Sequence, residues 1–133
     1  MNIHSVFSTD QGLEKAGITI DYGDFQVRIA RAGGANKEFS KLLDRLTKPY
    51  RRAIDTGTID LKIAERIEHE VYARSVILGW EGVTDSKDKP IKFTPEACMQ
   101  LFEDLPDFFI DIRQQAQTVV LFRAEVQEGA AKN

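Results

Sequence analysis

The side chains that could carry out catalysis are few in this 133-residue chain, and their spacing does not favour a reaction centre. There are two histidines, His4 and His69, and one cysteine, Cys98. In the stretch HEVYA the position four residues after His69 is Ala73, so the chain lacks the His-Glu-x-x-His pattern of a helical zinc site. We therefore expect no metal site and no cofactor.

Cys98 and the acidic stretches EDLPD and FFID are the remaining groups with reactive chemistry. No histidine lies near Cys98 in the sequence, so we interpret this thiol as a small, buried, apolar side chain. Paired carboxylates can perform acid–base chemistry, but acidic residues on a helix are far more often solvated charges. The chain has no G-x-x-x-x-G-K-[ST] loop for phosphate binding. We expect a protein that is not an enzyme.

The net charge of −3 is unevenly distributed along the chain. Residues 31–54 contain seven Lys/Arg and two Asp/Glu, whereas residues 94–133 contain seven Asp/Glu and three Lys/Arg. This asymmetry is compatible with a charged partner, with self-association, or with two faces of one monomer that attract each other. Residues 36–54 could also neutralise nucleic-acid phosphates, but the next predicted helix is acidic and would repel a duplex. A small nucleic-acid-binding regulator is therefore kept only as an alternative.

Length and composition favour a single domain over residues 1–133. No apolar run approaches the roughly 18 residues that span a bilayer, so we expect no membrane association. The first residues have neither the basic nor the apolar region of a signal peptide. A single cysteine excludes an internal disulfide and is compatible with a reducing compartment. We expect a cytoplasmic protein.

Hydrophobic periodicity predicts a mainly α-helical fold of about four to five helices with an N-terminal β-hairpin. Residues 1–16 have no convincing period and are interpreted as a mobile leader. Two alternating segments around Gly23 predict the hairpin over residues 17–30. Helical spacing predicts a helical body over residues 36–125 and a frayed tail over residues 126–133.

Several residues mark the ends of the predicted helices. We expect the Asn36 side chain to cap the first helix and Pro49 to kink or divide it. The apolar stripe of this helix is Phe39, Leu42, Leu43, Leu46, Tyr50 and Ile54. The second helix is predicted from about residue 59 to residue 78. Later boundaries are marked by Thr94, Pro95 and Pro106.

The stretch VILGWEGVTD contains the only tryptophan, Trp80, between two glycines. We expect Gly79 to adopt the left-handed conformation that ends a helix, which would place Trp80 back against that helix or its neighbour. Gly82 then lets the chain turn away into a long loop. Trp80 either covers the core under this loop or belongs to a contact surface.

Several fragments in the second half of the chain, in this order and spacing, resemble those of tail assembly chaperones of long-tailed, non-contractile bacteriophages. The fragments are VYARSVILG, GWEGVTDSKDKPIKFTPE and LFEDLPDFFIDI, and the earlier stretch RIARAGGANKEFSKLLDRLTKPYRRAIDTGTID is also similar. The resemblance covers about residues 18–115. One departure is SKDKP, which lacks the glycine that often precedes the Lys-Pro pair. The motif residues are Gly79, Gly82, Pro90, Thr94, Pro95 and Pro106.

The resemblance implies a non-virion protein in the cytoplasm of the infected bacterium. Such chaperones bind the phage tape-measure protein, keep it soluble and help recruit tail-tube protein around it, without a cofactor. An exposed apolar groove would hold an amphipathic partner helix by its i, i+3, i+4 and i+7 side chains. Candidate contact residues, which core packing would explain equally well, are Trp80, Phe93, Phe102, Phe108 and Phe109. A head–tail connector of the virion is a further alternative.

The last residues add a hypothesis about the gene. In this family a longer product is often made by programmed frameshifting near the end of the coding region. Ala131, Lys132 and Asn133 can be encoded by GCA-AAA-AAC, which contains the slippery heptamer A-AAA-AAC. We expect an extended form if the gene contains this heptamer.

Overall fold

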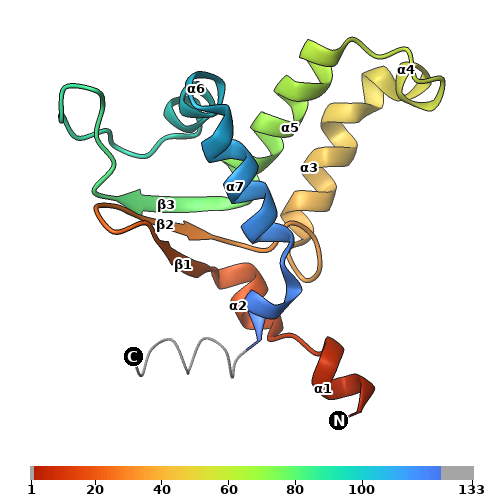
Figure 1. Cartoon of the computed structure of the whole chain (residues 1–133). Coiled ribbons are helices and arrows are strands. Elements are labelled where there is room, and N and C mark those ends of the chain that lie inside the picture. Colours follow the sequence, from red (N-terminus) through yellow and green to blue (C-terminus); the bar gives the residue numbers. More distant parts are fainter. Residues whose placement is uncertain (1, 124–133) are drawn as a thin grey trace.

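The computed structural model describes residues 2–123, which form a three-stranded antiparallel sheet and a set of helices (Figure 1). The helices are α1 (Ile3–Phe7), α2 (Gln11–Ala16), α3 (Lys37–Thr47), α4 (Arg51–Asp55), α5 (Leu61–Ser75), α6 (Pro95–Asp104) and α7 (Pro106–Gln117). The strands are β1 (Ile18–Asp21), β2 (Gln26–Ile29) and β3 (Ile77–Glu81), and the 3-10 helices are η1 (Lys48–Tyr50) and η2 (Val119–Phe122). The predicted class, mainly α-helical with an N-terminal β-hairpin, is confirmed.

The hairpin of β1 and β2 follows from alternation in the sequence. Ile18 pairs with Ile29 and Ile20 pairs with Val27, so the apolar side chains of both strands share one face. The turn passes through Gly23, whose φ of 95° suits glycine, and the Asp21 carboxylate accepts a hydrogen bond from the Gly23 amide at 2.8 Å.

The second predicted helix is shorter than expected, because residues 77–81 form a strand. α5 ends at Ser75, and β3 pairs with β2, with Val27 opposite Trp80 and Ile29 opposite Ile77. The prediction that Gly79 ends a helix in a left-handed conformation is therefore wrong. Short apolar runs fit a helix or a strand equally well, and here pairing with β2 decides the outcome.

Gly82 is the residue at which the chain turns away from β3. Its φ is 79°, and a Cβ atom at this position would lie 2.6 Å from the carbonyl oxygen of Asp24 in the β1–β2 turn. Only glycine fits both the backbone conformation and this close approach. The prediction that Gly82 provides the turn agrees with this geometry.

The core lies between the sheet and the C-terminal half of α5, α6 and α7 (Figure 1). η2 contributes Phe122 to this core, and that side chain is fully buried. Other side chains without solvent exposure are Val27, Ile29, Val76, Cys98, Phe102 and Ile112. Burial raises the pKa of the Cys98 thiol to about 12, which agrees with its interpretation as a packing residue.

Residues 1–16, for which the sequence predicted no regular element, contain α1 and α2. Asp10 caps α2 through its side chain, and its amide donates to the carbonyl oxygen of Phe122 at 2.8 Å. These contacts connect α2 to the end of the core. The mobility of this segment stays a prediction.

Glu14 of α2 is a buried carboxylate that holds the loop before α3. It accepts hydrogen bonds from the Thr9 hydroxyl, from the Ala35 amide at 2.5 Å and from the Arg31 guanidinium at 3.2 Å. Burial alone would raise the pKa of Glu14, but the Thr9 and Ala35 hydrogen bonds and the charge of Arg31 lower it overall. The sequence pattern missed this anchor because a single buried charge leaves no periodic signal.

The chain from α3 to α5 forms a helical hairpin that projects away from the sheet (Figure 1). Pro49 divides its first arm at η1, as predicted. The prediction that the Asn36 side chain caps α3 is wrong: its amide group donates instead to the carbonyl oxygens of Arg31, at 2.8 Å, and Ser75, at 2.9 Å. Asn36 thereby holds the base of α3 against the end of α5.

Both later helix boundaries agree with the sequence. The Thr94 hydroxyl accepts a hydrogen bond from the Ala97 amide at 3.0 Å, Pro95 occupies the first position of α6, and Pro106 opens α7. The predicted end near residue 125 and the tail 126–133 lie outside the described residues, as do the residues of the frameshifting hypothesis. Within residues 2–123, no helix is both long and apolar enough to cross a membrane.

Candidate functional site

Trp80 joins the long loop after β3 to the sheet. Its indole Nε1 donates to the carbonyl oxygen of Ile91 at 2.7 Å, and its ring meets that of Phe93 edge to face at 5.0 Å. Because Trp80 pairs with Val27, its side chain lies on the core face of the sheet. Of the two predicted roles, covering the core under the loop agrees with these contacts.

At the tip of that loop, Asp88 of the SKDKP stretch adopts the backbone conformation for which a glycine would be expected. Asp88 stands directly before Lys89 and Pro90, and its φ is 60°, in the left-handed region. Asp is one of the few residues other than glycine that adopt this conformation readily. The Asp85 carboxylate, which accepts hydrogen bonds from the amides of Lys87 and Lys89, completes a tight polar turn.

The five aromatic candidates for partner contact do not form one surface. Phe102 and Phe109 are buried in the core, where their rings meet at 4.9 Å, so neither is accessible to a partner in this conformation. Phe108 is half-buried and packs against Tyr22 of the β-hairpin, apart from the Trp80–Phe93 pair. Aromatic residues at helical spacing indicate an apolar face, but the sequence does not say whether another element covers it.

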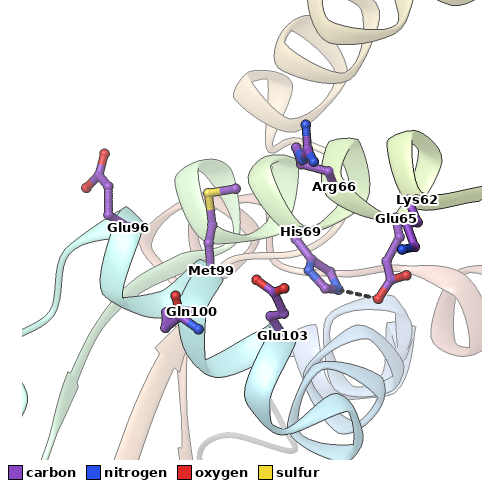
Figure 2. Close-up of a pocket in the computed structure, with 8 residues that line it drawn as sticks. All are labelled: Lys62, Glu65, Arg66, His69, Glu96, Met99, Gln100 and Glu103. Carbon is purple, nitrogen blue, oxygen red and sulfur yellow. Dashed lines mark ion pairs between the residues drawn. The ribbon is translucent and has the colours of Figure 1, made fainter.

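A polar cleft of about 470 Å³ lies between α5 and α6 (Figure 2). Its lining mixes cations, carboxylates and uncharged side chains: Lys62, Glu65, Arg66, His69, Glu96, Met99, Gln100 and Glu103. Within residues 2–123, no group of three or more His, Cys, Asp or Glu side chains is placed to hold a metal ion. The arrangement therefore offers no set of converging groups for metal chemistry.

His69 is a buried side chain of this cleft that packs against core residues. Its ring packs against Phe102 and Phe109 at 5.6 and 4.6 Å, and its Nε2 lies 3.8 Å from a carboxylate oxygen of Glu65. Burial lowers the pKa of His69, and the nearby Glu65, Glu68 and Glu103 offset this only in part. Through these ring contacts His69 packs α5 against α6 and α7.

The second concave surface is an apolar groove of about 330 Å³ along the helical hairpin, which we call the hairpin groove. Eight of its eleven lining side chains are apolar, so its chemistry is that of a site for apolar groups. The lining residues are Phe39, Leu43, Thr47, Ile54, Ile59, Ala64, Ile67, Glu68, Val71, Tyr72 and Gln117.

Helix periodicity builds this groove. On α3, Phe39, Leu43 and Thr47 follow one another at intervals of four residues and therefore line one side. Phe39 meets Tyr72 of α5 edge to face at 5.6 Å, which closes the inner end. Toward the outer end Leu43 is 37% exposed and Ile54 is 41% exposed. The groove is therefore open to a partner's side chains toward its outer end.

Part of the exposed apolar surface lies on the helical hairpin that carries this groove. Of the ten large apolar side chains exposed within residues 2–123, four lie in the short span 43–61, and these are Leu43, Tyr50, Ile54 and Leu61. Clusters of this kind, rimmed by charge, are typical of interaction sites. The sequence showed the stripe on α3, but it could not show that the body of the protein leaves one side of that stripe uncovered.

Basic side chains stand at the outer end of the hairpin groove. Lys48, Arg51 and Arg52 are exposed around the Pro49 turn, and the guanidinium group of Arg51 bonds to the Asp44 carboxylate at 2.8 Å. From α3 to α4 the chain carries six Lys/Arg and three Asp/Glu. We call Lys48, Arg51 and Arg52 the basic rim, because they lie in the sequence between the lining residues Thr47 and Ile54; the only charged side chain among the described lining residues is Glu68.

Comparison with known proteins gives one match. A family model described as YdaY prophage protein matches residues 34–133, a range that includes every residue lining the hairpin groove. No curated protein and no solved structure matches the chain.

Proposed function

This chain belongs to the YdaY family of prophage proteins, and from that premise we propose that it is a tail assembly chaperone. It binds the tape-measure protein of its prophage, keeps this protein soluble and promotes assembly of the tail tube around it. It works in the cytoplasm of the bacterial host and is not part of the finished virion. The sequence resemblance described above supports this role, and the hairpin groove supplies a surface for it.

The observation that carries the proposal is the exposed apolar lining of the hairpin groove. α3 has 11 residues and is about 16 Å long, which corresponds to about three turns of a partner helix lying beside it. An amphipathic helix would place side chains at i, i+4 and i+7 between Leu43, Ile54 and Ile59. Each large apolar side chain buried there would contribute about 1.5–3 kcal/mol before the costs of association.

Such binding needs no chemical step. Long helical segments of a tape-measure protein expose apolar stripes until tube subunits cover them, and covering a stripe prevents its association with other copies. A groove that is open toward one end would release its client when a larger apolar surface competes. This fits a protein that handles a client during assembly and then leaves it.

The proposal is tested by co-expression of this protein with the tape-measure protein of the same prophage. We expect a soluble complex that survives size-exclusion chromatography at moderate and at high salt, because apolar contacts are not weakened by screening. The double substitution Leu43→Ser/Ile54→Ser should abolish the complex. The matched control is Ile3→Ser/Phe7→Ser, which also removes two exposed apolar side chains, on α1, and should leave the complex intact.

Three outcomes would contradict the proposal. If the tape-measure protein is equally insoluble with and without this chain, there is no chaperone activity. If a complex forms but dissociates steeply with added salt and with nuclease treatment, the basic face of α3 and α4 binds nucleic acid instead. If the protein co-sediments with finished particles, it is a structural component such as a head–tail connector.

A further inference from the structure

We propose that the free protein forms a two-fold dimer in which the hairpin groove of each copy covers an acidic apolar surface of the other copy. This inference goes beyond the proposed function and concerns the purified chain without a client. It rests on three features of residues 2–123: a second apolar surface, its charge, and its place beside the groove.

The second surface is the corner between α6 and α7, which we call the acidic corner and which consists of Asp104, Leu105, Pro106, Asp107 and Ile110. Leu105 is 54% exposed and Ile110 is 40% exposed, and every residue from 103 to 107 is exposed. Leu105 directly precedes α7, and Ile110 lies in its first half. Exposed aliphatic side chains of this kind match the chemistry of the hairpin groove, which has a volume of about 330 Å³ and a mostly apolar lining.

The helices that carry the two surfaces have opposite net charges. α6 and α7 together carry five Asp/Glu and one Arg, whereas α3 to α4 carries six Lys/Arg and three Asp/Glu. When Leu105 enters the groove of a second copy, Asp104 and Asp107 approach the basic rim at Lys48 and Arg52. Complementary charge around an apolar contact fixes its register and opposes other arrangements.

The two surfaces lie side by side on one face of the molecule. The hairpin groove and the concave surface beside Pro106 and Ile110 share Ala64 and Glu68 as lining residues. The ion pair between Glu68 and Arg113, at 2.7 Å, marks the border between them. A face that carries both a groove and its complement can make the same contact twice around a two-fold axis.

The closed arrangement explains why both surfaces carry exposed apolar side chains in a single copy. Pairing removes Leu43, Ile54, Leu105 and Ile110 from water. In a two-fold dimer both grooves are covered, whereas head-to-tail association would leave one groove open at the end of each assembly. Pairing also covers the client site of the proposed function in the free protein. A client would then have to displace the second copy.

The test is sedimentation velocity of the purified wild-type protein from about 1 µM to about 200 µM, a range in which weak interfaces associate. We expect a monomer–dimer equilibrium with no higher species. Lys48→Glu/Arg52→Glu and Asp104→Lys/Asp107→Lys should each weaken the dimer at least about ten-fold, because each homodimer then opposes like charges. Lys87→Glu/Lys89→Glu in the loop after β3 is the matched control and should dimerise like the wild type.

Mixing the two charge variants gives the decisive result. In a mixed dimer the acidic rim of one copy meets the basic corner of the other, and the unchanged rim meets the unchanged corner, so both contacts are restored. Recovery of the dimer in the equimolar mixture is the expected result. A wild-type protein that is monomeric throughout, or a mixture that stays monomeric, would overturn the proposal.

Circular dichroism should confirm that each variant is folded before it is used. Asp107 lies in the first turn of α7, where a lysine is unfavourable to the helix dipole. If that variant does not fold, Leu105→Ser tests the same corner: it should weaken the dimer, and an unchanged dimer would overturn the proposal.

Discussion

The core and the helical hairpin use the same kind of apolar stripe in different ways. Phe109, Ile112 and Ala116 of α7 follow one another at helical spacing and are all buried. α3, every residue of which the structure describes, has an equally clear stripe but no buried residue. Amphipathicity therefore predicts which face of a helix will pack against another apolar surface. It does not predict whether that surface belongs to the same chain.

Ion pairs in the two regions differ in the same way. Glu14 and Arg31, at 3.2 Å, are largely shielded and also bind the backbone at Ala35. Asp44 and Arg51 in the hairpin are closer, at 2.8 Å, but each side chain is more than half exposed. Solvent screening makes exposed pairs worth about 0–1 kcal/mol, so the shorter distance does not indicate the stronger anchor. The hairpin charges are better suited to a partner than to stability.

The largest expected contrast comes from truncating one apolar side chain in each region. Phe102→Ala should lower the free energy of unfolding by about 3–5 kcal/mol, because it leaves a cavity at a site without solvent exposure. Leu43→Ala should lower it by about 1 kcal/mol or less, because the side chain is partly exposed already. Urea denaturation of both variants measures the difference. Equal losses would mean that the hairpin groove is core and not a free surface.

The next largest effect on the free energy of unfolding is expected from removing the charge of the buried Glu14 side chain. Glu14→Gln should cost about 1–3 kcal/mol at pH 7, because the Thr9, Ala35 and Arg31 donors lose a charged acceptor. The pKa of Glu14 is lowered in the folded protein, so its contribution is complete above the ordinary value of 4.5 and is lost as the pH falls through the lowered value.

The pH dependence provides the control for that substitution. In urea denaturation at a series of pH values, wild type and Glu14→Gln should converge at low pH, where the wild-type carboxyl is also neutral. Asp44→Asn in the exposed pair should leave the pH profile nearly unchanged. A gap between wild type and Glu14→Gln that stays constant down to low pH would show that charge at Glu14 does not matter.

The smallest effect is expected at Trp80. Trp80→Phe keeps an aromatic ring near Phe93 but removes the hydrogen bond to Ile91, which should cost about 1 kcal/mol. Hydrogen exchange should accelerate at the Ile91 amide, which bonds to the Val83 carbonyl group, and remain unchanged in α3. Unchanged exchange at Ile91 would mean that the indole does not hold the loop.

Residues that act through local chemistry could be predicted from the sequence, whereas elements that depend on distant pairing could not. Gly23, Pro49, Thr94 and Pro106 act through their own backbone or hydroxyl groups, so their positions follow from sequence. The strand 77–81 depends on pairing with β2, which is far away in the chain. From the sequence alone, the apolar run at the start of this strand was predicted to be the end of a helix. Of the two roles that the sequence left open for Trp80, covering the core agrees with its contacts, but Trp80 lies in a strand and not after the end of a helix.

The candidate site was harder to predict than the fold. The aromatic residues predicted as partner contacts include Phe102 and Phe109, whose side chains are buried. The hairpin groove is built from aliphatic residues such as Leu43 and Ile54, which look like ordinary core positions in the sequence. Which stripe remains open depends on how α3 and α5 leave the body, and this is a property of the three-dimensional arrangement alone.

The most direct test of the central claim is hydrogen–deuterium exchange of this protein with and without the tape-measure protein of its prophage. If the hairpin groove binds the client, amides of α3, α4 and the first half of α5 should become protected in the complex, while those of the loop 82–94 should not change. Protection confined to the loop around Trp80 and Phe93, or no protection in the hairpin of a stable complex, would contradict the account.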